Sequence, residues 1–339
     1  MFASRVLTST TRIIEGRPVT LLFHSSLRTM ASTGPIPPPA CLLKPMEIPK
    51  RELYGPGPST MPSLIGESQS RPLLGHLHPE FVEIMSQVRL GLQYVFKTRN
   101  AYTPRRNGSR SAEPRRAGRD APRCPGRNLG HPSCGPRSPP WTEGRAARVK
   151  PAVIFVCQGE SSTGIMQPLE GLGDLAKAHG SLLLVDTVAS LGGAPFDADA
   201  LGVDCVYSAT QKVLNAPPGL APISFSDRAI AKIKARKTRV ASFYFDALEL
   251  GNYWGCDGEA RRYHHTAPIS SVYALREALA IVAKKGIDPL IEQHRVAGGL
   301  GATVGKIFRV GTFGGNSEPE KAKAILAKFI GVVKAQSKI

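Results

Sequence analysis

The chain has 339 residues, enough for one large domain and a smaller one, and 42% of them are hydrophobic. It contains no run of 18 apolar residues, which excludes an obvious membrane span. The net charge of +18 suggests nucleic-acid binding, but residues 104–150 carry half of it, with eleven Arg and one Lys against three acids. No zinc-finger spacing or aromatic pattern accompanies these charges, so we expect no nucleic-acid partner.

Both ends of the chain resemble targeting signals. Residues 1–30 contain four Arg and a single Glu, with apolar residues dispersed among Ser and Thr, as in a mitochondrial transit peptide. A disordered tail is the alternative. The chain ends in Ser337-Lys338-Ile339, close to the peroxisomal Ser-Lys-Leu signal. The sequence therefore predicts import into mitochondria, peroxisomes or both, the latter through the peroxisomal import receptor.

Residues 31–59 form a proline-studded arm, too kinked for regular structure. The arm ends in the turn GPGPS, where glycines such as Gly57 let the backbone approach another group closely. An ordinary loop is the alternative. From Glu80 to Arg99 apolar residues recur at helical spacing, which predicts an amphipathic helix.

Residues 101–150 break this pattern. Eight Pro and six Gly lie between positions 104 and 150, aliphatic residues are almost absent, and we expect disorder. A basic binding arm is the alternative. Such an arm usually has aromatic residues among its charges, whereas Trp141 is the one Trp, Phe or Tyr of this segment after position 104. Cys124, His131 and Cys134 lack a fourth ligand at a suitable spacing, so we predict no metal site.

Alternation of strands and helices follows. Ala152–Cys157 is predicted as a buried strand, a helix is expected from about Leu169 to Ala178, and further strands end at Asp186 and near Tyr207. This order predicts an α/β fold with a mainly parallel sheet and right-handed crossovers.

Lys212 and Asp186 are the candidate reactive pair. Asp186 ends one predicted buried strand and Lys212 follows another, and the carboxyl ends of neighbouring parallel strands meet at one crevice. Pyridoxal phosphate requires a lysine for its Schiff base and an acid for its pyridinium nitrogen. A solvated surface lysine is the ordinary alternative for Lys212.

The last third is mainly helical in pattern. A short apolar segment, Leu220–Phe225, precedes a basic helix at Ser226–Arg236 and another helix at Ser271–Lys285. A glycine-rich piece and a final amphipathic helix follow Gly286. We therefore expect a large domain over residues 60–285, interrupted at 101–150, and a shortened C-terminal domain over residues 286–339.

Several motifs carry a resemblance to one family. In chain order they are GPGPS, QYVFKTRN, GESSTG, LLLVDTVASLGG, SATQKVLNAPPG, YWGCD, YHHT, and GGLG followed by GKIFRVG. Together they resemble the alanine–glyoxylate (serine–pyruvate) aminotransferases, class V pyridoxal-phosphate enzymes of fold type I. The resemblance covers residues 41–100 and 151–339. It implies transfer of the amino group of alanine or serine to glyoxylate or pyruvate, in glyoxylate detoxification.

The resemblance also implies roles for the matching residues. Lys212 would form the Schiff base and move the substrate α-proton, and Asp186 would keep the ring nitrogen protonated. The other implied contacts are Gln211 and Ser161 with the cofactor, Tyr263 and Thr266 with the phosphate bound by the partner subunit of a homodimer, and Gly57 and Arg309 with the substrate. Taken singly, Ser161 could instead cap a helix, Tyr263 and His264 could be core polar residues with satisfied hydrogen bonds, and Arg309 could be a surface charge.

Two family features are missing from this sequence. Residues 101–150 contain neither the Ser-Gly-His turn that binds the cofactor phosphate at a helix start nor the aromatic residue that stacks on the ring. The segment between Arg295 and Gly298 is also shorter than in the family. The alternative interpretation is therefore a catalytically impaired isoform, or a mispredicted gene model, of the same family.

Overall fold

A computed structural model of the chain describes residues 11–14, 17–20, 39–49, 53, 57–102, 105–107, 150–161 and 165–294, and positions 320, 321, 323, 324, 327 and 330. The chain divides into two units, Met1–Arg51 and Glu52–Ile339. In the first unit, β1 (Thr11–Ile14) and β2 (Arg17–Thr20) form an antiparallel hairpin. A short 3-10 helix, η1 (Ala40–Leu43), is the regular structure described in the proline-rich arm.

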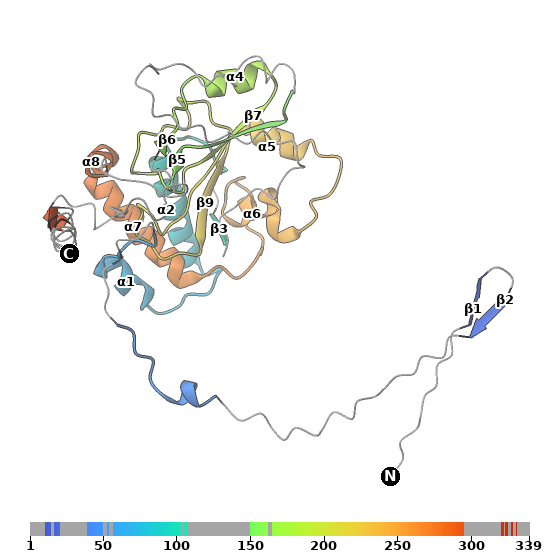
Figure 1. Cartoon of the computed structure of the whole chain (residues 1–339), viewed down its shortest axis with the longest axis horizontal. Helices are drawn as coiled ribbons and strands as arrows, with labels where there is room; N and C mark the ends of the chain where they lie inside the picture. Colours follow the sequence, from blue (N-terminus) through green and yellow to red (C-terminus); the bar gives the residue numbers. More distant parts are fainter. Residues whose placement is uncertain are drawn as a thin grey trace, which may run out of the picture. The chain divides into compact units, whose positions relative to one another are not determined.

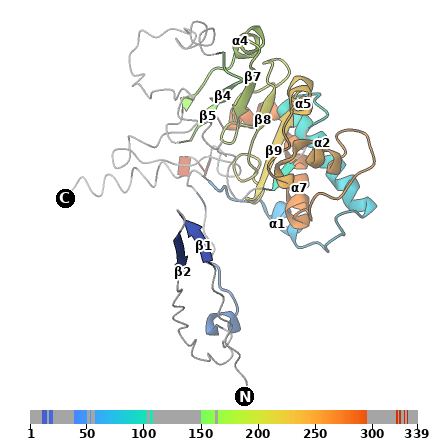
Figure 2. The ribbon, with the colours of Figure 1, turned by 90° about the vertical axis from the view of Figure 1, so that its right-hand side faces the viewer.

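The second unit is built around a five-stranded sheet, seen in Figure 2. Its strands, in spatial order, are β3 (Arg105–Asn107), β9 (Leu220–Phe225), β8 (Cys205–Tyr207), β7 (Leu182–Asp186) and β4 (Val153–Cys157). The pairs β4–β7 and β7–β8 are parallel, whereas β8–β9 and β3–β9 are antiparallel. Among the described strands the sheet is therefore mixed, and the prediction of parallel neighbours holds for the pairs on either side of β7.

Residues 101–150 include one ordered piece that the composition did not indicate. Arg105–Asn107 pair with Leu220–Pro222 of β9, and Tyr102 accepts a 2.8 Å hydrogen bond from the backbone N–H of Phe225. These three residues form an edge strand through backbone pairing, which needs no apolar periodicity, and the expectation of disorder over residues 101–150 stays a prediction. Residues 108–149 lie outside the described residues.

The helices flank this sheet (Figure 1). They are α1 (Ser63–Gln69), α2 (Pro79–Phe96), α4 (Leu172–Ala178), α5 (Asp227–Lys234), α6 (Ala247–Tyr253), α7 (Ile269–Lys285) and α8 (Ile287–Gln293), with the 3-10 helix η2 (Phe243–Phe245). A small antiparallel pair, β5 (Gly159–Glu160) and β6 (Ile165–Met166), follows β4.

The helices predicted from periodicity form, with shifted ends. The helix expected over Glu80–Arg99 is α2, which ends at Phe96 because Lys97 adopts a left-handed conformation with φ of 48°. The helix expected from Leu169 is α4, which begins only at Leu172, after Gly171 with φ of 79°. In both cases a left-handed residue next to the helix sets its end.

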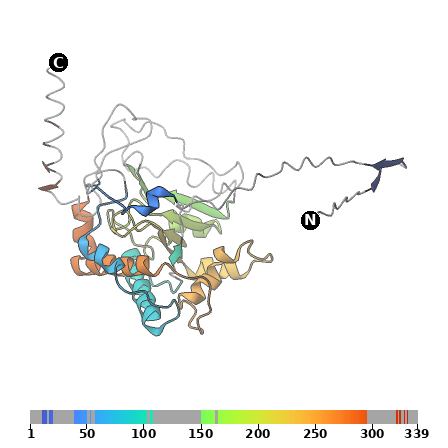
Figure 3. The same cartoon turned by 90° about the horizontal axis from the view of Figure 1, so that it is seen from below.

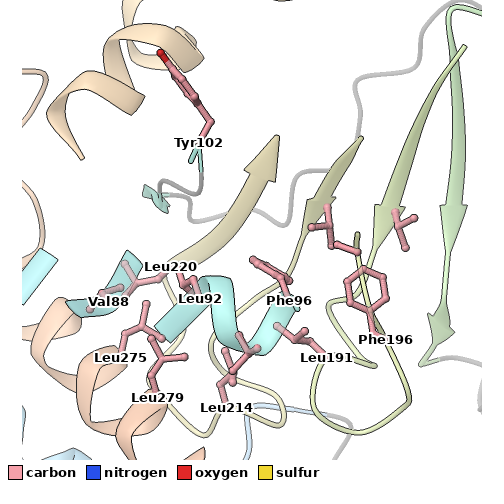
Figure 4. Close-up of a cluster of buried hydrophobic side chains, with 14 of the residues drawn as sticks. Val88, Leu92, Phe96, Tyr102, Leu191, Phe196, Leu214, Leu220, Leu275 and Leu279 are labelled. Atoms are coloured by element: carbon pink, nitrogen blue, oxygen red, sulfur yellow. The ribbon is translucent and has the colours of Figure 1, made fainter. Parts of the chain in front are cut away.

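The core lies where α2 and α7 pack together and against the sheet (Figures 3 and 4). Helix α2 contributes Val88, Leu92 and Phe96, all fully buried, and α7 contributes Leu275 and Leu279. Leu214, within the loop after β8, and Leu220, the first residue of β9, belong to the same cluster. Core residues thus anchor this segment on the C-terminal side of Lys212.

In the segment of the expected final amphipathic helix, the described positions 320, 321, 323, 324, 327 and 330 are helical. The other expectations for the C-terminal part concern residues outside the described range. These include the glycine-rich piece at residues 298–315. The predicted domain limits stay predictions. Within the described part of the chain, no helix is long and apolar enough to cross a membrane.

Candidate active site

The carboxyl edge of the sheet aligns three polar side chains in one row. Cys157 of β4 lies opposite Asp186 of β7, and Asp186 lies opposite Tyr207 of β8. Each is the last residue of its strand. Parallel pairing therefore brings together the ends of three strands that are far apart in sequence.

Asp186 is held by two hydrogen-bond donors. The hydroxyl of Tyr207 donates to Oδ2 at 2.6 Å, and the backbone N–H of Val188 donates to Oδ1 at 2.7 Å. Burial raises the pKa of this carboxyl above its ordinary value, the two hydrogen bonds oppose that rise, and the charge of Glu160 adds to it. The result is a half-buried carboxyl with each oxygen engaged once.

The other two members of the row are neutral donors near neutral pH. Burial, with the charges of Asp186 and Glu160, raises the pKa of the Cys157 thiol to about 12. Burial and the hydrogen bond to Asp186 raise the pKa of Tyr207 above its ordinary value. Asp186 is consequently the member of the row that ionises first.

Lys212 lies on the loop between β8 and β9, five residues after Tyr207. This loop is closed on itself, since Thr210 donates its hydroxyl to the carbonyl oxygen of Pro217 at 2.5 Å and accepts the N–H of Ala216 at its own carbonyl, 3.0 Å away. Asn215 adopts a left-handed conformation with φ of 59°, which turns the chain inside the loop. The backbone of the lysine segment is therefore tied at both ends.

A second segment, near the start of the described second unit, contacts this loop. Ser59 is buried and donates its hydroxyl to the carbonyl oxygens of Gln211 and Lys212, at 3.0 and 2.8 Å, while its N–H donates to Gln211 at 2.9 Å. Gly57 lies directly against the lysine side chain: a Cβ at this position would be 2.6 Å from Nζ. The GPGPS turn thus makes the close approach that its glycines predicted, and the group it approaches is Lys212.

Tyr263 and Thr266 form an exposed pair after α6. Their hydroxyl oxygens lie 3.3 Å apart, and Tyr263 has 54% of its surface exposed, with its ring centroid 5.0 Å from that of His76. The neighbouring His264 is buried, stacks on Phe243, and lies with its Nε2 at 3.0 Å from the carbonyl oxygen of Phe243. The pair is therefore exposed to solvent, and the buried His264 between its two members anchors this segment to the protein.

Of the other predicted site residues, Ser161 directly follows β5 and is half-buried. Arg309 lies outside the described residues, as does most of the segment that lacks the phosphate-binding turn. Within the described part of the chain, no group of three His, Cys, Asp or Glu could hold a metal ion.

Two residues of this site were not predicted from the sequence. Tyr207 could have been found, because it ends its strand as Asp186 ends the neighbouring one. The hydroxyl contacts of Ser59 could not, since they join residues 152 and 153 positions apart.

The described groups fit pyridoxal phosphate. A carboxyl held by two donors ends β7, and a lysine amine packed against a glycine lies on the loop that follows the neighbouring β8. These are the amine that attaches the cofactor and the acid that faces its ring nitrogen. An α/β sheet with this pair at its carboxyl edge defines a pyridoxal-phosphate enzyme of fold type I.

Comparison with known proteins is consistent with this class. The chain belongs to the class-V aminotransferase family, whose model matches residues 145–332. It is thus a pyridoxal-phosphate-dependent transaminase. The resemblance that its motifs carry is confirmed.

Individual relatives cover most of the chain. It is 43% identical over 298 residues to the alanine–glyoxylate aminotransferase of Callithrix jacchus, covering 80% of this chain and 72% of the relative. The alanine–glyoxylate aminotransferase of Drosophila melanogaster is 32% identical over 380 residues, covering 86% and 94%. A solved structure of an alanine–glyoxylate aminotransferase from Nostoc sp. superimposes with a TM-score of 0.71 at 32% identity, covering 83% of this chain and 94% of that one.

Proposed function

We propose that this chain transfers the amino group of alanine, or of serine, to glyoxylate or pyruvate, as an alanine–glyoxylate aminotransferase of glyoxylate detoxification. The observation that carries the proposal is Asp186 at the carboxyl end of β7, Lys212 on the loop that follows the neighbouring β8, and Gly57 against the lysine amine. The names of the relatives support the choice of substrates.

Each described residue has a chemical task in this proposal. When bound, the cofactor supplies an electron sink that stabilises negative charge on the substrate α-carbon. Lys212 would hold the cofactor through Nζ, and the same atom, once free, would take and return the α-proton. Asp186 would keep a proton on the ring nitrogen. Gln211 would contact the cofactor phosphate, and Ser161, which follows β5, would also contact the cofactor.

Two groups would hold the substrate. The Arg309 guanidinium suits its carboxylate, because a rigid planar fork makes two parallel hydrogen bonds. The backbone of Gly57 would contact the substrate close to the lysine amine, against which this glycine lies.

The proposed assembly is a homodimer. Tyr263 and Thr266 of each subunit would contact the phosphate bound by the other, and the exposure of Tyr263 in one subunit supports this. Residues 1–30 would direct the protein to the mitochondrial matrix, and the terminal Ser337-Lys338-Ile339 would address it to the peroxisomal import receptor. Tagging either end and locating the protein in cells tests both signals.

One observation favours a second candidate, an impaired isoform or mispredicted gene model. The segment at residues 101–150 lacks the phosphate-binding turn and the ring-stacking aromatic of the family. Each missing contact is worth about 1–3 kcal/mol of cofactor binding. Sequencing the transcript across codons 98–152 tests the gene-model version, which a confirmed and translated segment would refute.

The deciding experiment uses the purified chain with added pyridoxal phosphate. The proposed enzyme turns yellow, retains the cofactor after borohydride treatment, and forms glycine and pyruvate from glyoxylate and alanine. Lys212→Ala should lose the borohydride-fixed mass. A wild-type protein that stays colourless and produces no glycine would refute catalysis by this chain.

A further inference from the structure

Tyr207 is a buried phenol whose hydroxyl group has a carboxylate as its acceptor. The side chain is 5% exposed, and its oxygen lies 2.6 Å from Oδ2 of Asp186. The contact follows from the register of β7 and β8, where these two residues are directly paired. A buried tyrosine normally uses its hydroxyl for a hydrogen bond, but a charged acceptor makes that bond about twice as strong.

The carboxylate is restrained from two directions. Val188, two residues further along, donates its N–H to Oδ1, whereas Tyr207 reaches Oδ2 from the neighbouring strand. A carboxylate offers about four acceptor positions, of which these donors occupy two. The two bonds fix the plane of the carboxylate and leave it capacity for a cationic partner.

The surroundings of Asp186 otherwise favour its neutral form. Burial raises its pKa, and the charge of Glu160 on β5 adds to that rise. Cys157 on β4, the titratable neighbour on the other side, carries no compensating positive charge. Tyr207 and Val188 are the groups that lower the pKa, so Tyr207 supplies one of two bonds that keep the carboxyl ionised.

We propose that Tyr207 is a positioning residue for the cofactor: its hydroxyl holds the carboxylate of Asp186 ionised and in one orientation toward the ring nitrogen. This inference rests on the role proposed for Asp186. Strand β8 therefore orients Asp186 through Tyr207, in addition to leading into the loop that carries Lys212. The phenol itself contacts neither substrate nor lysine in this proposal.

The test compares pyridoxal phosphate binding by cofactor-free wild-type protein, Tyr207→Phe and Tyr273→Phe, from about pH 5 to pH 8. Tyr273 is the matched control because it is also buried, and its hydroxyl donates to the carbonyl oxygen of Pro72, on another part of the fold. Loss of a hydrogen bond to a charged group should weaken cofactor binding about tenfold or more in Tyr207→Phe. The loss should be larger at the acidic end, where Asp186 of the variant takes up its proton first. Tyr273→Phe should bind as wild type does at every pH.

A double variant separates positioning from a general loss of structure. In an Asp186→Asn background, Tyr207→Phe should no longer weaken binding, because the group that it positions is gone. An equal loss in both backgrounds, or unchanged affinity and pH profile in the single variant, overturns the inference.

Unfolding of the cofactor-free proteins provides a readout that does not require binding. The pKa of Asp186 is higher in the folded protein than in the unfolded chain, so its contribution to the free energy of unfolding is fully present below the ordinary carboxyl pKa. This contribution is lost as the pH rises through the folded-state pKa. Removing Tyr207 raises the folded value further, so the stability deficit of Tyr207→Phe should grow with pH, whereas that of Tyr273→Phe should stay constant. A deficit independent of pH contradicts the inference.

A wild-type protein that binds cofactor but transfers no amino group refutes the proposed function and leaves the Tyr207 comparison intact.

Discussion

The hydroxyl of Ser59 lies 2.8 Å from the carbonyl oxygen of Lys212, 153 positions further along the chain. The same hydroxyl is 3.0 Å from the carbonyl oxygen of Gln211. The turn that opens the described second unit therefore binds the backbone of the segment that carries the reactive lysine. Gly57, two residues before Ser59, contacts the lysine side chain itself. This turn supports the lysine segment at both its backbone and its side chain.

Replacing Ser59 with alanine should destabilise the protein by about 0.5–1.5 kcal/mol, because two half-buried carbonyl groups lose one of their donors. It should also speed cofactor release, since the lysine loop loses a support. Denaturant unfolding and the rate of cofactor loss on dilution measure the two effects. Ser59→Thr keeps the hydroxyl and is the control. A Ser59→Ala protein with wild-type stability would show that the hydroxyl contributes nothing net.

Gly57→Ala should prevent normal attachment of the cofactor. The new Cβ would lie 2.6 Å from Nζ of Lys212, and the backbone φ of 126° is itself unfavourable for alanine. Gly219→Ala is the matched control, because Gly219 has a similar φ of 116° but open space at its Cβ position. Mass spectrometry after borohydride treatment should find the cofactor on the control and much less on Gly57→Ala. Equal labelling of both variants would contradict the steric explanation.

Cys157 should resist alkylation although it lies beside the proposed site. A thiol with a pKa of about 12 holds roughly one thiolate in ten thousand at pH 8, and the thiolate is the reactive form. Peptide mapping after iodoacetamide treatment should find the exposed Cys41 modified and Cys157 largely intact. Asp186→Asn should raise the rate at Cys157, because the carboxylate charge is one cause of the high pKa. Rapid labelling of Cys157 in the folded wild type would refute this prediction.

The buried carboxylate of Asp204 should depend strongly on Arg228. Asp204 is 3% exposed and accepts hydrogen bonds from Arg228, from Ser226 and from the N–H of Leu183. Arg228→Ala would leave this charge buried without its cation, at a cost of about 2–4 kcal/mol in unfolding free energy after allowance for the partly exposed arginine.

The control for Arg228 is an ion pair at the surface. Arg262 and Glu249 are 3.3 Å apart, with both side chains partly exposed. Arg262→Ala should therefore cost less than about 1 kcal/mol. Chemical denaturation measures the free energy of unfolding of both variants. Similar losses would mean that the burial of Asp204 does not govern the strength of its ion pair with Arg228.

Much of the strand and helix pattern could be predicted from the sequence. The apolar runs before Asp186 and Tyr207 form β7 and β8, and the helical spacing after Glu80 forms α2. Such patterns are local, since a strand or helix buries its apolar face at a fixed period. Helix ends were less predictable, because they depend on left-handed residues such as Lys97 and Gly171.

The sequence by itself determined the family of this protein and the identity of its candidate lysine and carboxylate, because long motifs and the order of strands are written along the chain. Only the tertiary structure decided that Tyr207 donates to Asp186 and that Ser59 and Gly57 contact Lys212. It also decided that Arg105–Asn107 join the sheet at β9. These contacts depend on strand register and on the meeting of segments far apart in sequence, and no local period of side chains encodes either.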